Sequence, residues 1–140
     1  MKRMASCSKD KSIIIWNITN FETIKYLYGH LGPVISLTLI DDQYLASGSC
    51  DKTILIWNLN NYTINTILKG HSDCINVLSY YYKSKFIISG SNDNTVILWN
   101  SQTFTYNRTL PKFNDSIISL TNSDHINCKQ KACLDYIMQN

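Results

Sequence analysis

Short apolar runs bounded by polar turn residues recur along the chain. Residues 13–16, 54–57 and 96–99 are three such runs. Their length is typical of strands buried on both faces and disfavours helices. Residues 45–49 and 86–91, each with a glycine near its end, precede the second and third runs and are also predicted to be strands. The Asp-Lys and Asp-Asn pairs between these strands favour tight turns.

The pattern repeats at a fixed interval. Three columns keep a spacing of 41 or 42 residues: Trp16, Trp57 and Trp99; Asp10, Asp51 and Asp93; Gly29-His30 and Gly70-His71. Strands expected around 34–39 and 62–68 complete a set of four, and no segment before residue 121 shows helical periodicity. Four short strands per interval predict one small antiparallel sheet per repeat, stacked face to face with the next.

A family resemblance follows from these columns. The order G-H, then S-G-S, then D-x-[ST]-[IV]-[IL]-[IL]-W resembles the WD40 repeat, whose period is about 40–45 residues with four strands per propeller blade. The final dipeptide is Trp-Asn in all three copies instead of Trp-Asp. The resemblance covers residues 3 to about 121. It implies an all-β fold, an incomplete β-propeller of stacked four-stranded antiparallel blades.

The expected blades are incomplete at both ends of the repeat region, 1–121. Blade one is expected at 3–28 without its first strand, blade two at 33–69, blade three at 74–110, the first strand of a fourth blade at 116–121, and a degenerate tail at 122–140. Phe113 stands where a third His is due. Because propellers typically close with 4–8 blades, three outcomes stay open. The chain is a piece of a longer propeller, it assembles with another chain, or it is a degenerate product without a stable fold.

His, Ser and Asp recur together, which on a simple motif scan suggests a hydrolase triad. The WD40 resemblance implies instead a buried structural tetrad in which Trp bonds Ser, Ser bonds His and His bonds Asp. Carried over by position, the tetrads are His30, Ser47, Asp51 and Trp57; His71, Ser89, Asp93 and Trp99; and, without a His, Ser6, Asp10 and Trp16. Buried polar groups need partners, whereas catalysis needs one copy in a cleft. We therefore expect no catalytic residue, no cofactor and no metal site.

Composition and charge add few constraints. The formal charge of +3 comes from scattered lysines and arginines, whereas nucleic-acid binding favours a basic stripe. No apolar run approaches the roughly 18 residues of a membrane span, and the N-terminus lacks the apolar region of a signal peptide. The five cysteines form no C-x-x-C pair. We therefore expect reduced thiols in a cytoplasmic or nuclear protein that is not secreted.

These observations favour a non-catalytic protein–protein interaction scaffold, part of a larger propeller or multiprotein complex. Expected partners are other proteins or peptides, a second copy sharing a strand, or further WD40 repeats, and no membrane. Candidate partner-binding residues lie beside the Asp turns and Gly-His loops, or after a strand end: Lys9, Cys50, Asn92, Leu31, Ser72 and Tyr82. Ordinary solvated turn residues would vary in the same way. The alternatives are an RNA- or nucleic-acid-associated WD40 protein and, with less support, a propeller enzyme.

Overall fold

Every regular element in the described part of the chain, residues 2–121 and 132–133 of the computed structural model, is a β-strand. Blade one contains β1 (Arg3–Cys7), β2 (Ile13–Asn17) and β3 (Glu22–Leu27). Blade two contains β4 (Val34–Leu39), β5 (Tyr44–Ser49), β6 (Thr53–Asn58) and β7 (Thr63–Lys69). Blade three contains β8 (Ile75–Tyr81), β9 (Phe86–Ser91), β10 (Val96–Asn100) and β11 (Thr105–Thr109).

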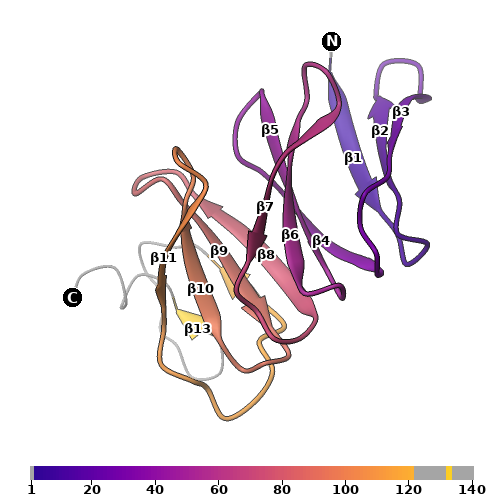
Figure 1. Ribbon diagram of the computed structural model, residues 1–140. Helices are drawn as coiled ribbons and strands as arrows, with labels where there is room; N and C mark the ends of the chain where they lie inside the picture. The colour runs from indigo at the N-terminus through magenta and orange to yellow at the C-terminus, as the bar shows by residue number, and fades with distance from the viewer. Residues whose placement is uncertain (1, 122–131, 134–140) are drawn as a thin grey trace.

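Within each of these three sheets the strands pair antiparallel with their neighbours in sequence order. Figure 1 shows the sheets as successive layers, from indigo through magenta to orange. The prediction of an all-β, incomplete propeller built from antiparallel blades is therefore confirmed. No helix in the described residues is long and apolar enough to cross a membrane.

The tight turns owe their shape to two positions that recur in each repeat. The backbone is left-handed, with φ between 53° and 76°, at Lys11, Lys52 and Asn94, and at Phe21, Tyr62 and Phe104. Non-glycine residues adopt this backbone region at a cost in conformational free energy. Other interactions in the turns must therefore offset that cost. The turn Asp offsets part of it, because Asp51 Oδ1 accepts hydrogen bonds from the N–H and the hydroxyl of Thr53 at 3.0 and 2.6 Å.

The core lies between the sheets. Ile54, Ile56 and Leu68 of blade two pack with Ile75 and Ile87 of blade three, and a second cluster joins blades one and two. Strands β6 and β10 are buried on both faces along their apolar runs, as predicted from their sequence. Close approach of the layers requires glycine on β5, because a Cβ at Gly48 would lie 2.7 Å from Ile75 Cγ2.

The segment after blade three differs from its prediction. A strand is expected over 116–121, but residues 116–119 form none, and β12 (Leu120–Thr121) pairs in parallel with β13 (Ala132–Cys133). Ile117 is nevertheless buried, and its N–H donates to the Ser91 carbonyl at 3.0 Å, as Val34 N–H donates to Ser8 at the first junction. Residues 116–119 pack on blade three but form no ladder, because no described strand lies beside them to pair with. Among the described residues, β13 pairs only with Leu120 and Thr121. The rest of the expected tail, 122–131 and 134–140, lies outside the described residues.

Candidate functional site

Blade two gathers four polar side chains from separate strands and loops. His30 comes from the loop before β4, Ser47 from β5, Asp51 from the β5–β6 turn and Trp57 from β6. The indole Nε1–H of Trp57 donates to Ser47 Oγ at 2.8 Å. The His30 ring lies 2.7 Å from Ser47 Oγ through Nε2 and 2.7 Å from Asp51 Oδ2 through Nδ1. The structure thus brings together all four residues expected in this blade.

The chemistry of the four groups sets the direction of each bond. A carboxylate only accepts, so His30 Nδ1 carries the proton and donates to Asp51. When Nδ1 alone carries a proton, Nε2 accepts the hydroxyl proton of Ser47, whose oxygen accepts from Trp57. Asp51 Oδ2 also accepts the Leu31 N–H at 2.9 Å. The quartet therefore fixes the loop that follows His30 as well as the two inner strands.

Blade three repeats this arrangement. Trp99 Nε1–H donates to Ser89 Oγ at 2.9 Å, and the His71 ring lies 2.8 Å from both Ser89 Oγ and Asp93 Oδ2. The N–H of Ser72 donates to Asp93 Oδ2 at 2.8 Å. The second expected set is likewise assembled, with the same role for the loop after the His.

Blade one has a shorter version without a His. Trp16 Nε1–H donates to Ser6 Oγ at 2.8 Å, but Asp10 is exposed and bonds only locally, accepting from the hydroxyl and N–H of Ser12 at 2.6 and 2.9 Å. The Trp–Ser and Asp halves of this set are therefore not linked by any described residue.

Electrostatics favour an ionised Asp and a neutral His in blade three. Burial raises the pKa of Asp93, but hydrogen bonds from Thr95, the Ser72 N–H and His71 outweigh it and bring the pKa down to about 2. Burial lowers the pKa of His71, although Asp93 opposes this shift. For Asp51 burial again acts upward, and bonds from Thr53, His30 and Leu31 give a net lowering of the pKa.

The serine hydroxyls of the two Ser-His-Asp sets are not accessible to a substrate. Ser47 and Ser89 are both 0% exposed, and each hydroxyl oxygen already accepts an indole N–H. A nucleophile needs an adjacent cavity in which the reacting atom can sit. Among the described residues, no group of three or more His, Cys, Asp or Glu side chains is placed to hold a metal ion.

The candidate partner-binding residues are divided between the two ends of the blades. Lys9, Leu31, Cys50, Ser72 and Asn92 lie at the end that carries the His loops and Asp turns, which we call the Gly-His end (residues 8–11, 29–33, 49–52, 70–74 and 91–94). Four of them are exposed, Leu31 to 83%, and Cys50 is half-buried. Tyr82 is 63% exposed but follows β8, at the opposite end.

The cysteine prediction was wrong for one pair. Cys50 and Cys74 form a disulfide, whereas reduced thiols are expected from the sequence. Cys50 follows β5 and Cys74 precedes β8, so the two positions meet only because blade three stacks on blade two. Cys7 is a free thiol.

Sequence reasoning also missed a second buried serine in blades two and three. Ser49 is fully buried, donates to the Gly32 carbonyl at 3.1 Å and accepts the Asp51 N–H at 3.0 Å. Ser91 makes the equivalent bonds to the Asp73 carbonyl and the Asp93 N–H at 3.2 and 3.1 Å. The last Ser of the S-G-S column was the available signal.

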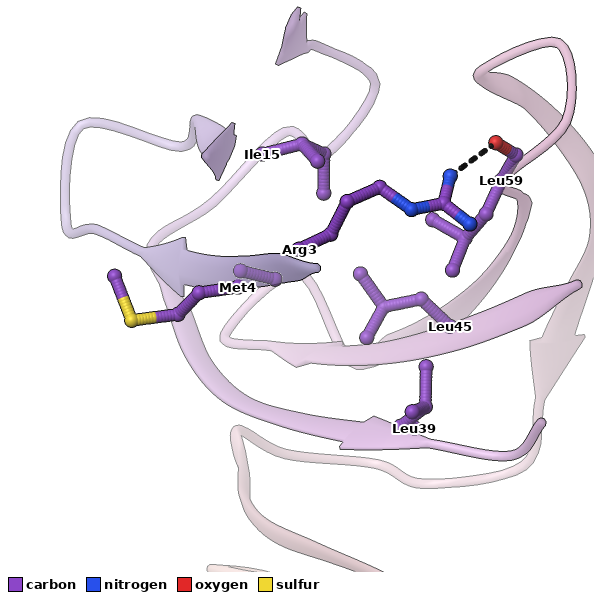
Figure 2. Close-up of a pocket in the computed structure, with 7 residues that line it drawn as sticks. Arg3, Met4, Ile15, Leu39, Leu45 and Leu59 are labelled. Atoms are coloured by element: carbon purple, nitrogen blue, oxygen red, sulfur yellow. Dashed lines mark hydrogen bonds between the residues drawn. The ribbon is translucent and has the colours of Figure 1, made fainter. Parts of the chain in front are cut away.

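A small cavity of about 50 Å³ lies between blades one and two at the end opposite the Gly-His end. Its lining is mainly apolar and includes Met4, Leu39 and Leu45. Figure 2 shows Arg3 reaching across it to donate to the Leu59 carbonyl, at 3.0 Å. The arginine ties the start of β1 to blade two.

Four-stranded antiparallel sheets that recur at a fixed sequence interval, stack on one another and each contain a hydrogen-bonded Trp–Ser–His–Asp quartet define a β-propeller repeat protein. The family model described as "WD domain, G-beta repeat" matches residues 1–17, 21–58 and 62–100, more than half of the chain. The chain therefore belongs to the WD40 family, and the resemblance predicted from its columns is confirmed. The family match ends at residue 100, before the limit of about 121 predicted from the columns.

Two solved structures are similar to the chain, one titled "Structure of U3-55K" and the other "Crystal structure of RRP9 WD40 repeats". Each is 29% identical to it, covers 81% of it and superposes with a TM-score of 0.77. The chain spans only 37% and 36% of the length of these two structures. A comparison with curated proteins found no match.

Proposed function

We propose that the chain is a non-catalytic platform for protein binding whose contact surface is the Gly-His end. WD40 repeats are typical of protein-interaction scaffolds. The observation that carries the proposal is the contrast within each loop. His30 is buried and the Leu31 N–H is held by Asp51, yet the Leu31 side chain is exposed. A rigid loop presenting a free apolar side chain loses little entropy on binding.

A matched pair of variants tests which end binds. Leu31→Glu removes an apolar side chain at the Gly-His end, and Phe21→Glu removes one that is 81% exposed in the β2–β3 turn at the opposite end. The tagged 140-residue protein is used to capture partners from cell extract at moderate salt. We expect the Leu31→Glu variant to capture at least tenfold less partner than the parent protein, and the Phe21→Glu variant to capture the same amount. Equal capture by both variants would rule out this surface.

Nucleic acid and catalysis are the competing functions. The described charges form no basic stripe, so protein capture is expected to tolerate salt. Binding to random RNA that falls steeply with salt would favour the nucleic-acid alternative. For the enzyme alternative, the buried Ser47 and Ser89 offer no accessible nucleophile. A nuclear or cytoplasmic location suits a scaffold of this kind.

A second copy of the chain is one candidate partner. β4 and β8 are the first strands of blades two and three, and among the described residues no strand pairs with β1 on the corresponding side. An antiparallel strand from another copy would complete that sheet. Light scattering that finds only monomer, with or without residues 116–120, would exclude this partner.

A further inference from the structure

The Cys50–Cys74 disulfide occupies a structural position that recurs at every blade junction. One residue precedes the turn Asp, and the other stands at the entrance to the next blade. By the 41- and 42-residue steps of the repeat, the equivalent pairs are Lys9 with Pro33 and Asn92 with Ser116. Only the junction between blades two and three therefore has two thiols at these positions in the described chain, and there they are bonded.

The disulfide joins one His–Asp pair to the next. Cys50 directly precedes Asp51, which binds the His30 ring and the Leu31 N–H. Cys74 follows His71 by three residues, and its carbonyl accepts the Asn92 N–H at 3.0 Å. The bond thus links two parts of the Gly-His end. The Asp51 turn, which holds the loop 29–33, is joined to the loop 70–74 of the next blade.

The two cysteine residues differ in their exposure to solvent. Cys50 is half-buried, whereas Cys74 is 8% exposed. A small thiol in solution therefore reaches the Cys50 sulfur more readily, and Cys74 becomes the leaving group. Exchange rates depend on such access as well as on thiol acidity.

We propose that the Cys50–Cys74 bond is a reversible redox link, reduced by glutathione or a similar small thiol, that restrains the Gly-His end between blades two and three and so sets its affinity for a protein partner. The last step of this inference rests on the proposed function. The first step, reversible restraint of the two loops, stands without it.

The reaction is balanced by two molecules of glutathione. The first thiolate attacks the Cys50 sulfur and forms a mixed disulfide, and Cys74 leaves as a thiolate that takes up a proton. The second thiolate attacks the glutathione sulfur of that mixed disulfide, forms glutathione disulfide and releases Cys50, which also takes up a proton. Glutathione disulfide reverses both steps.

The experiment uses the 140-residue protein equilibrated in buffers of varied glutathione to glutathione-disulfide ratio. Free thiols are trapped by alkylation and located by mass spectrometry, and amide hydrogen exchange is measured in parallel. We expect Cys50 and Cys74 to become alkylated together in one two-electron transition, while the alkylation of Cys7 does not follow that transition. Amides of residues 29–32 and 71–74 should exchange several-fold faster after reduction.

The matched control is the double variant Cys50→Asn/Cys74→Ser, which copies Asn92 and Ser116 from the next junction. It should show the faster exchange at every glutathione ratio. Full alkylation of Cys50 and Cys74 in excess glutathione disulfide would overturn the proposal, and so would equal exchange in the oxidised and reduced protein. If amide hydrogen exchange responds to the glutathione ratio but the Gly-His end captures no protein partner, the proposed function fails and the redox link remains.

Discussion

At the scale of single residues, the buried quartets are most simply understood as bracing. Each contains an indole N–H, a hydroxyl, an imidazole and a carboxylate, and every polar group has a partner within 2.9 Å. Satisfied buried networks rigidify a fold, whereas one missing member leaves the others unpaired at a cost of about 1–3 kcal/mol per group. The repetition of the quartet in successive blades fits bracing better than catalysis.

His71→Ala tests this role directly. The change leaves Ser89 and Asp93 without their shared partner, so we expect the free energy of unfolding to fall by about 2–4 kcal/mol. Ser72→Ala is the neighbouring control, because Ser72 contributes its backbone N–H and its side chain is exposed. Denaturant unfolding should show the control within about 0.5 kcal/mol of the parent protein. Similar losses in both variants would contradict the bracing role.

The dependence of stability on pH has a defined sign. Burial lowers the pKa of His71 in the folded state, so protons bind preferentially to the unfolded chain, and stability falls as the pH drops below the ordinary value of 6.5. The pKa of Asp93 is also lowered, to about 2, so a further loss is expected between about pH 4 and pH 2.

Urea midpoints measured from pH 8 to pH 2.5 check this prediction. They should be highest above pH 7 and fall in two ranges, the first below pH 6.5 and the second below pH 4. A midpoint that stays constant from pH 7 to pH 3, or that rises on acidification, would show that the quartets do not hold their protons as described.

At the scale of elements, the first strands of neighbouring blades are joined by a specific polar contact in addition to apolar packing. Ser36 on β4 accepts the N–H of Leu78 on β8 at 2.9 Å. Leu78 is 6% exposed, so its N–H has little access to water if the serine hydroxyl is removed.

Ser36→Ala should therefore lower the free energy of unfolding by about 1–2 kcal/mol. It should also speed hydrogen exchange at the Leu78 amide more than at amides of blade one. Ser119→Ala is the matched control, since Ser119 occupies the equivalent column two repeats later and is exposed. A loss of equal size at Ser119 would mean that the contact between β4 and β8 has no particular importance.

The sequence predicted those elements whose cause lies within one repeat. The double-sided burial of β6 and β10 follows from apolar runs that recur with the period. The meeting of His30, Ser47, Asp51 and Trp57 was implied by the WD40 resemblance that the recurring columns carry. The Cys50–Cys74 contact could not be read in that way, because its two positions belong to different columns and meet only across a junction. Residues 116–119 have the apolar pattern of a strand, but pattern alone cannot supply the neighbouring strand that a ladder requires.

At the scale of the whole molecule, the stability of the stack comes from its junctions. Ile54 and Ile75 are almost completely buried between blades two and three, and each repeat contacts chiefly its neighbours, as in other repeat proteins. The chain covers little more than a third of the two similar solved structures. Within the described residues, the internal bracing of each blade holds the Gly-His end in place.

Hydrogen exchange of the three indole N–H groups, followed by NMR, tests that bracing most directly. Trp57 and Trp99 are 2% exposed, and each donates to a serine that is also bonded to a His. Trp16 is less buried, and no His in the described residues bonds to its serine. We expect slow exchange at the indole N–H groups of Trp57 and Trp99 and faster exchange at that of Trp16. Exchange at Trp57 and Trp99 as fast as that of a solvent-exposed indole would contradict this expectation.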